Sequence, residues 1–277
     1  MKIGFLGFGE VASTLTNGLL NQGADVYTCV EGRSIKTKQI AKETGVTLCK
    51  SNKELAKTSD ILISSVTPVQ AIKIAQEVGK HSKGVYVDIN NISPKTIKKT
   101  MSFIQNNKTV DAAIIGSVRQ GLDVQIIASG KYAKEFMELN QYGMNITIVG
   151  MELGQASAIK MLRSSFTKGI SALLFETIYS AYKMGIDEEV IKYIAKTECE
   201  GFKDSATSRI ISSAVHAKRR YEEMDEVTEL ISENLDPKMS NATQDFFKSL
   251  YENINKLEKR PDSYIDLFKI MEDLNKK

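Results

Sequence analysis

The sequence predicts a doubly wound α/β domain followed by an all-α domain. Residues 1 to about 150 alternate short apolar runs with amphipathic stretches of helical length, a pattern typical of a parallel sheet covered by helices on both faces. After Gly150 the strand signal stops, and residues 152–182 contain neither a strand-like run nor a proline. We therefore expect two domains, 1–150 and 151–277.

In the first domain, each expected strand is a short run rich in β-branched and other apolar residues. The expected strands are Lys2–Leu6, Asp25–Val30, Ile61–Val66, Val85–Ile89, Val110–Ile115, Gln125–Ala128 and Ile146–Val149. The helices expected between them are Val11–Asn21, Lys36–Glu43, Val69–Val78 and Pro94–Ile104. The near-continuous apolar character of the run that starts at Ile61 is typical of a strand buried on both faces.

The second domain is expected to begin with a long helix that joins the two domains. Its apolar residues recur with helical period at Ile159, Leu162, Phe166, Ile170, Leu173 and Leu174. Shorter helical segments are expected near 187–197, 203–233, 237–255 and 261–276. This half of the chain is therefore predicted to be helical throughout.

The composition is that of an ordinary globular protein and excludes several function classes. A formal net charge of +3 is too small for a nucleic-acid footprint, and no apolar run approaches the roughly 20 residues that span a bilayer. The cysteines Cys29, Cys49 and Cys199 form no CxxC pair and fit a reducing cytoplasm. The two histidines, His81 and His216, are too few for a histidine-rich metal site, so we predict no metal.

The most informative short motif is the stretch GFGEVA at residues 7–12, which follows the first expected strand and opens a helix. In this GxGxxA pattern the first glycine allows a tight turn and the second leaves room for a pyrophosphate. The small third residue lets helix and strand pack closely, and the helix N-terminus supplies free N–H groups. The motif predicts a Rossmann-type dinucleotide site; the alternative is a tight turn without a ligand. The expected cofactor-binding residues here are Gly7, Phe8, Gly9, Glu10 and Val11.

The end of the second expected strand bears on which dinucleotide is bound. An acidic residue there holds the ribose 2′-OH of NAD, whereas basic residues favour the 2′-phosphate of NADP. The sequence supplies both kinds of residue, with Glu31 followed by Arg33 and Ser34. Because a guanidinium and a hydroxyl at a helix start can hold a phosphate, we favour NADP and keep NAD as the alternative.

Four further stretches carry a family resemblance: DINNISP at 88–94, DAAIIGS at 111–117, GQASAIK at 154–160 and RSSFTKG at 163–169. Together with the glycine motif they make residues 1–185 resemble the β-hydroxyacid dehydrogenases, which include 6-phosphogluconate dehydrogenase and 3-hydroxyisobutyrate dehydrogenase. Residues 205–250 resemble the helical C-terminal domain of phosphogluconate-dehydrogenase-like proteins. The resemblance implies a Rossmann-type domain, a helical domain, a site in the cleft between them, and a homodimer.

The resemblance also implies that Lys160 is the catalytic lysine, which accepts a proton from the substrate hydroxyl as hydride leaves its carbon. A lysine partly desolvated beside a cofactor can have its pKa lowered towards neutrality, which suits proton transfer. Lys160, Ser164 and Thr167 are spaced to share one polar face of the helix. The alternative is a solvated surface lysine.

The remaining expected site residues follow from the same motifs. Further expected cofactor-binding residues are Ser65, Val66, Thr67 and Asn90, and expected substrate-binding residues are Asn91, Gly116, Ser117, Ser164, Lys168 and His216. Three positions depart from the family pattern. Ser164 stands where the family usually has asparagine, Ile115-Gly116-Ser117 replaces Ser-Gly-Gly, and Asn91 replaces a serine or threonine. His216 beside three cations would help to hold an anion, with an exposed charged helix face as the alternative.

We therefore expect a cytoplasmic NAD(P)-dependent oxidoreductase that transfers hydride between a nicotinamide cofactor and a small anionic β-hydroxy acid, or its semialdehyde or keto form. Two alternatives remain at this stage. One is an imine or pyrroline-carboxylate-type reductase, which shares the same two-domain plan and works without the lysine. The other is a non-catalytic dinucleotide-binding module that keeps Gly7 and Gly9 but lacks catalytic geometry.

Overall fold

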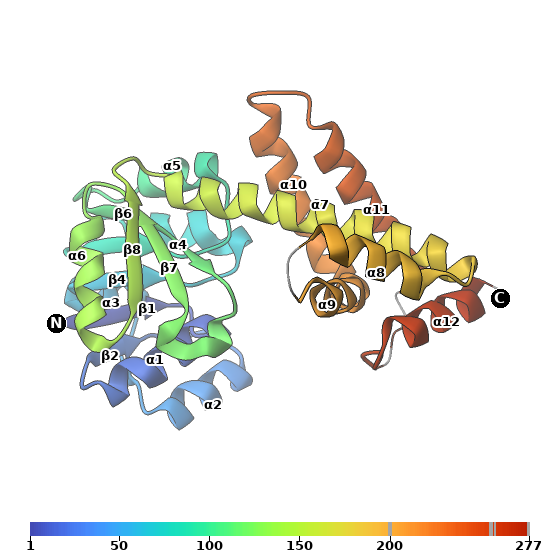
Figure 1. The fold of residues 1–277 in the computed structure, drawn as a ribbon. Helices are drawn as coiled ribbons and strands as arrows, with labels where there is room; N and C mark the ends of the chain where they lie inside the picture. Colours follow the sequence, from blue (N-terminus) through green and yellow to red (C-terminus); the bar gives the residue numbers. More distant parts are fainter. Residues whose placement is uncertain (199–200, 255–256, 258, 276–277) are drawn as a thin grey trace. The chain divides into compact units, whose positions relative to one another are not determined.

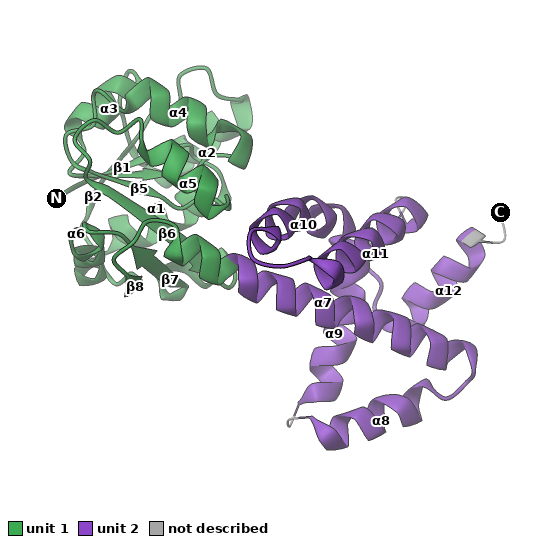
Figure 2. Ribbon diagram, turned by 90° about the horizontal axis from the view of Figure 1, so that it is seen from above, with its two compact units in different colours: residues 1–160 green, residues 161–277 purple. Residues whose placement is uncertain are grey.

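The computed structural model describes residues 1–198, 201–254, 257 and 259–275. The chain divides into two compact units, residues 1–160 and 161–277 (Figure 2). Cys199 lies outside the described residues. Over the described parts of the chain, no helix combines the length and the apolar character that a membrane-spanning segment requires.

The first unit is built on an eight-stranded sheet with the order β3-β2-β1-β4-β5-β6-β7-β8 (Figure 1). All neighbouring strands are parallel except β6 and β7, which are antiparallel. The strands are β1 (Lys2–Leu6), β2 (Asp25–Thr28), β3 (Thr47–Leu48), β4 (Ile61–Ser64), β5 (Val85–Asp88), β6 (Thr109–Ile115), β7 (Gln125–Ser129) and β8 (Asn145–Gly150). The doubly wound α/β class is therefore confirmed, and the two-residue strand β3 adds an edge that the sequence pattern did not predict.

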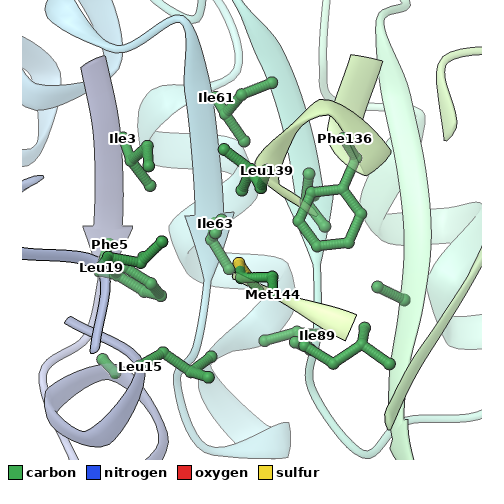
Figure 3. Packing of buried hydrophobic residues seen from close by; sticks show 14 of the residues in the cluster. Ile3, Phe5, Leu15, Leu19, Ile61, Ile63, Ile89, Phe136, Leu139 and Met144 are labelled. Atoms are coloured by element: carbon green, nitrogen blue, oxygen red, sulfur yellow. The ribbon is translucent and has the colours of Figure 1, made fainter. Parts of the chain in front are cut away.

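Helices cover both faces of this sheet. One face packs against α1 (Glu10–Asn21), α2 (Ile35–Thr44), α6 (Ala133–Met137) and the 3₁₀ segment η3 (Glu138–Tyr142). Figure 3 shows this layer, with Leu15 and Leu19 of α1 and Phe136 of α6 lying over Phe5 and Ile63 of the strands. The other face packs against α3 (Asn52–Thr58), α4 (Ala71–Val78) and α5 (Pro94–Met101). The 3₁₀ segments η1 (Pro68–Gln70) and η2 (Val118–Asp123) follow β4 and β6.

Local capping explains where the shorter helices start. The Ser51 hydroxyl accepts a hydrogen bond from the Glu54 amide at the start of α3, and Ser93 does the same for Thr96 at the start of α5. Pro94 occupies the first turn of α5, where its missing N–H costs nothing. The sequence pattern did not predict α3 because only seven residues form it.

The long helix α7 (Gln155–Lys183) begins within the first unit. Its first turn is fixed there by Asp111 of β6, whose carboxylate accepts hydrogen bonds from the Ser157 amide at 3.0 Å and the Ser157 hydroxyl at 2.6 Å. Ser129 of β7 donates its hydroxyl to the same carboxylate and accepts the Ala156 amide. Because these contacts tie the start of α7 to the sheet, the first compact unit ends at residue 160, ten residues beyond the boundary expected at 150.

The second unit, in its described residues, is helical throughout. After α7 come α8 (Asp187–Thr197), α9 (Phe202–Val215), α10 (Ala217–Ser232), α11 (Lys238–Ile254) and α12 (Tyr264–Asn275). Its core gathers Phe175 and Ile178 of α7 with Ile210, Phe247 and Phe268 from the other helices. The prediction of one continuous helix over 203–233 is wrong, since the backbone at His216 (φ −114°, ψ 19°) separates α9 from α10.

Most of the apolar stripe on α7 is not buried, although its helical spacing suggested a face that packs in the core. Leu174 is buried, but Leu162, Phe166 and Leu173 are more than half exposed, and Ile159 is 43% exposed. The side of α7 that enters the core is formed instead by residues such as Phe175 and Ile178. The stripe therefore predicted the helix correctly without identifying the face that packs in the core.

Candidate functional site

The candidate site lies at the edge of the sheet where the parallel strands β1, β4, β5 and β6 end. Residues that follow neighbouring parallel strands meet at one such edge, which is where dinucleotides bind in doubly wound folds. The loops that start at Gly7, Ser65, Ile89 and Gly116 follow these strands in turn. The fold thus brings the glycine motif and the resemblance stretches at 88–94 and 111–117 to the same edge of the first unit.

The glycine turn has the geometry that a dinucleotide diphosphate requires. Gly7 has φ +84°, and a Cβ there would lie 2.5 Å from the Ser65 carbonyl oxygen, so a larger residue would strain the turn. Gly9 borders open space, because a Cβ there would meet no atom from elsewhere in the described chain within 4 Å. Among the described residues, no side chain caps the N-terminus of α1. Its first-turn amides therefore remain available to an anion.

The other residues of the motif play different parts. Phe8 is buried at 2% exposure in the sheet core, so only its backbone can face a cofactor. Val11 is half-buried and packs against the same core. Glu10 is exposed, and its carboxylate lies 3.6 Å from the Nε of Arg119. The structure thus leaves the two glycines and the first-turn amides as the groups suited to a diphosphate.

Asn90 is buried and has its side chain engaged within the protein. Its Oδ1 accepts the Val66 amide at 2.8 Å, and its Nδ2 donates to the Ser64 hydroxyl at 3.0 Å. These bonds hold the loop of Ser65, Val66 and Thr67, of which Thr67 is exposed. Asn90 therefore positions this loop, a role that the local sequence pattern did not reveal.

The turn after β2 carries the residues expected to bind the cofactor's ribose or its 2′-phosphate. Ser34 is the N-cap of α2, and its hydroxyl accepts the Thr37 amide at 3.2 Å and shares a hydrogen bond with the Thr37 hydroxyl. Glu31 is exposed and Arg33 is half-buried. Sequence reasoning missed two apolar side chains near these loops, Ile35 at 87% exposure and Val69 at 80%. The available signal was a large apolar residue at the start of the helical segment that follows each strand, Ile35 in α2 and Val69 in η1.

Three further expected residues lie in the loops after β5 and β6. Asn91 is half-buried, while Gly116 and Ser117 are exposed. Gly116 has φ +123°, a conformation that favours glycine. The Ser117 hydroxyl accepts a hydrogen bond from the Arg119 amide at 3.4 Å, at the start of η2. These three residues therefore border the same sheet edge as the glycine turn.

Lys160 lies on α7, within the first unit, and is half-buried. Lys160 lies about one helical turn after Ser157, the residue that Asp111 anchors to the sheet. The contacts of Asp111 therefore fix the backbone of α7 close to Lys160.

In the second unit, Ser164 and Lys168 form one polar cluster. The Lys168 ammonium donates to the Ser164 hydroxyl at 2.8 Å and to Glu223 of α10 at 2.9 Å. Lys168 is only 6% exposed, and burial lowers its pKa while the neighbouring Glu223 opposes that shift. Glu223 was missed by sequence reasoning because its partner lies 55 residues earlier in the chain, outside any local pattern.

His216 stands at the junction of α9 and α10. Burial lowers its pKa, and the charges of Arg219 and Arg220 act in the same direction. Arg220 is held by the hydroxyls of Ser213 and Ser212, each at 3.0 Å, so its position is fixed. The cationic segment expected around His216 therefore has one anchored arginine, with Arg219 more exposed beside Glu223.

Asp88 at the end of β5 is a buried carboxyl group beneath the site loops. Its Oδ1 accepts the Asn90 amide at 2.9 Å, while its Oδ2 has no hydrogen-bond partner among the described residues. Burial raises its pKa from 3.8 to about 7. The neutral form is therefore favoured in the folded protein below about pH 7.

Asp88 should make the protein less stable as the pH rises. The folded-state pKa is above the unfolded one, so its stabilising contribution is complete below about pH 4 and is lost as the pH rises to about 7. The expected slope approaches about 1.4 kcal/mol per pH unit within that window. Chemical denaturation across that window measures it. Asp88→Asn should flatten the slope, and an unchanged slope would contradict the assignment to this residue.

Metal-ligating side chains do not gather anywhere in the described ranges. Over those residues, no group of three or more His, Cys, Asp or Glu side chains is placed to hold a metal ion. Among the cysteines that the structure describes, Cys29 is buried and Cys49 is half-buried, and both are free thiols.

Two family descriptions match parts of the chain. Residues 2–92 match "NADP oxidoreductase coenzyme F420-dependent", and residues 181–250 match "Domain of unknown function (DUF1932)". The first match covers the glycine turn and the strands up to β5, and the second covers the helical unit from the end of α7 into α11.

Relatives extend the similarity over most of the chain. An uncharacterized 28.5 kDa protein of Methanothermus fervidus is 44% identical over 253 residues, covering 91% of this chain and all of that protein. A solved protein of unknown function, described as structurally similar to 3-hydroxyacid dehydrogenases, is 48% identical with a TM-score of 0.83, covering 91% of this chain and 97% of its own. The 3-hydroxyisobutyrate dehydrogenase of Mycobacterium tuberculosis shares the fold at 14% identity and a TM-score of 0.77, covering 99% of this chain and 98% of its own. The chain belongs to the β-hydroxyacid dehydrogenase-like family of nicotinamide-dependent dehydrogenases and reductases.

Proposed function

We propose that this enzyme transfers hydride between NADP(H) and a small anionic β-hydroxy acid, or its semialdehyde or keto form. The observation that carries the proposal is the glycine turn, where Gly7 is conformationally required, Gly9 faces open space and α1 begins without a side-chain cap from the described residues. The bound nicotinamide would supply the hydride acceptor or donor. Gly7, Gly9, the first-turn amides and the Asn90-supported loop at Ser65–Thr67 would hold the cofactor.

Lys160 is the residue to which we assign general acid–base work. In the oxidative direction its neutral amine would take the proton of the substrate hydroxyl while the carbon loses hydride, so that a carbonyl forms. In the reductive direction its ammonium would return that proton to the carbonyl oxygen. A positioned lysine is suited to both steps when desolvation keeps its pKa near the working pH.

We assign the binding of the substrate's anionic end to Lys168, Ser164 and His216. The other proposed substrate-binding residues are Asn91, Gly116 and Ser117 of the first unit. Two observations support this assignment: the Lys168 ammonium donates to the Ser164 hydroxyl while it pairs with Glu223, and the Arg220 guanidinium is held in place by two serine hydroxyls. We further propose a homodimer in a reducing cytoplasm. The exposed apolar stripe on α7 and the free thiols Cys29 and Cys49 support these two assignments.

Calorimetric titration with NADPH and NADH, followed by a panel of hydroxy acids that includes phosphorylated sugar acids, tests the proposal. We expect NADPH to bind and at least one acid to reduce NADP, followed through the absorbance of the reduced nicotinamide. Gly9→Val is the matched negative control, because its side chain would fill the open space beside the turn. Failure of the wild-type protein to bind either dinucleotide would refute the proposal. Binding without turnover of any acid would favour a non-catalytic module.

Arg33 should decide the preference for NADP. Arg33→Gln is expected to weaken NADPH binding by about tenfold, or about 1.4 kcal/mol, since a guanidinium–phosphate contact is lost. NADH has no 2′-phosphate, so its dissociation constant should stay within about twofold. Fluorescence titration measures both constants. An equal loss for both cofactors, or tighter binding of NADH by the wild-type protein, would overturn the preference.

A further inference from the structure

The segment η2 is held tightly along α1. Leu122 of η2 lies over Gly18 of α1, where a Cβ would come within 2.4 Å of the leucine Cγ. Val118, at the other end of η2, packs against the sheet core. Because Gly18 admits this close approach, the two elements run side by side within the first unit, and the side chains between Val118 and Leu122 are set in relation to α1.

This packing brings Arg119 to the first turn of α1. Its Nε lies 3.6 Å from Oε1 of Glu10, with side-chain exposures of 86% and 67%. An ion pair this exposed contributes little to stability. Its significance is therefore its location, since Glu10 directly follows Gly9 and stands at the amide-rich end of α1.

The charges at this helix end are unfavourable for a dinucleotide unless a cation is present. Glu10 places a carboxylate beside the turn that would receive a doubly charged diphosphate, and like charges at short range repel. The Arg119 guanidinium offsets that carboxylate. It also offers several N–H donors in a planar arrangement that matches phosphate oxygens. An exposed arginine side chain can exchange one anionic partner for another with little rearrangement.

We infer that Arg119 is a direct ligand of the cofactor's diphosphate and that Glu10 holds it beside the site until the cofactor binds. On binding, the guanidinium leaves the Glu10 carboxylate and donates hydrogen bonds to phosphate oxygens. The inference rests on the proposed dinucleotide function and adds a residue outside the glycine motif. Because NADPH and NADH share the diphosphate, Arg119 serves affinity for both, unlike Arg33.

A double-mutant cycle tests this role. Dissociation constants for NADPH and NADH are measured by calorimetry for wild type, Arg119→Gln, Arg119→Lys, Glu10→Gln and the Glu10→Gln/Arg119→Gln double variant. We expect Arg119→Gln to weaken both cofactors by about tenfold or more. Arg119→Lys should weaken them less, because it keeps the charge. Glu10→Gln should tighten binding. The loss from Arg119→Gln should persist in the Glu10→Gln background, since the contact is with the cofactor itself.

Each contrary result has a distinct meaning. If the loss disappears in the Glu10→Gln background, Arg119 only neutralises Glu10 and the direct contact is refuted. Unchanged constants for Arg119→Gln, with normal binding by the wild type, refute the inference and leave the proposed function intact. Failure of the wild type to bind either dinucleotide refutes both. Thermal unfolding of each variant should match the wild type, because Arg119 is almost fully exposed.

Discussion

Lys160→Ala is expected to lower kcat by about 100- to 10,000-fold while leaving NADPH binding within about twofold. The proposed step needs a group that takes the hydroxyl proton as hydride departs, and alanine offers none. Steady-state turnover with the best acid from the panel measures kcat, and calorimetry measures cofactor binding. Both directions of the reaction should be affected, because the same group accepts and returns the proton.

Lys160→Arg separates proton transfer from simple charge. Arginine keeps the positive charge but stays protonated at any working pH, so it cannot act as a base. We therefore expect Lys160→Arg to be about as inactive as Lys160→Ala, and recovery of activity would assign an electrostatic role instead. Lys134→Ala, at an exposed position on α6, is the matched control and should keep full activity. Largely intact turnover in Lys160→Ala would contradict the hydroxyacid mechanism and favour an imine or pyrroline-carboxylate-type reductase.

Asp111→Ala should be among the most destabilising single substitutions in the first unit. The buried carboxylate accepts the amide and hydroxyl of Ser157 and the hydroxyl of Ser129, so its removal leaves three buried donors without this acceptor. We expect a loss of about 3 kcal/mol in the free energy of unfolding, since buried donors pay their desolvation cost when unpaired. Burial raises the pKa of Asp111, an effect opposed by the hydrogen bonds from Ser157.

Denaturant unfolding followed by circular dichroism measures this loss. Asp111→Asn keeps one carbonyl acceptor and should lose less, whereas the exposed control Asp25→Ala should change the free energy by no more than about 0.5 kcal/mol. The start of α7 should also loosen in Asp111→Ala, which would displace Lys160 and lower kcat even where the protein remains folded. Destabilisation no larger than that of the control would refute the anchoring role.

Much of the fold could be predicted because its signals are local. The expected strands at Lys2–Leu6 and Ile61–Val66 and the long helix after Gly150 depend on apolar spacing within short windows, and each is present. Strand β3 and helix α3 were missed because a two-residue strand and a seven-residue helix have too few residues to show a period. The break at His216 was missed because no glycine or proline marks it.

The candidate site was predictable to a lesser degree. Gly7 and Gly9 could be recognised from spacing, since the turn that they form is a local backbone feature. The hydrogen bonds of the Asn90 and Ser34 side chains could not be predicted in the same way. Asn90 binds Ser64 and Val66, which lie far from it in sequence, and the Ser34 hydroxyl caps α2. The roles of Glu223 and Arg119 depend on contacts with residues far away in sequence. Glu223 pairs with Lys168 of α7, and Arg119 pairs with Glu10 of α1.

The sequence alone therefore determined the α/β plan, the glycine turn and the family resemblance, since periodicity and motif spacing are properties of neighbouring residues. Only the tertiary structure decided which polar groups remain available to ligands and which are used internally. It buried Phe8 and Asn90, joined Lys168 to Glu223, anchored α7 through Asp111 and brought Arg119 to Glu10. The physical reason is that a hydrogen bond or ion pair depends on distance in space, and residues far apart in the chain meet only after the strands and helices have packed.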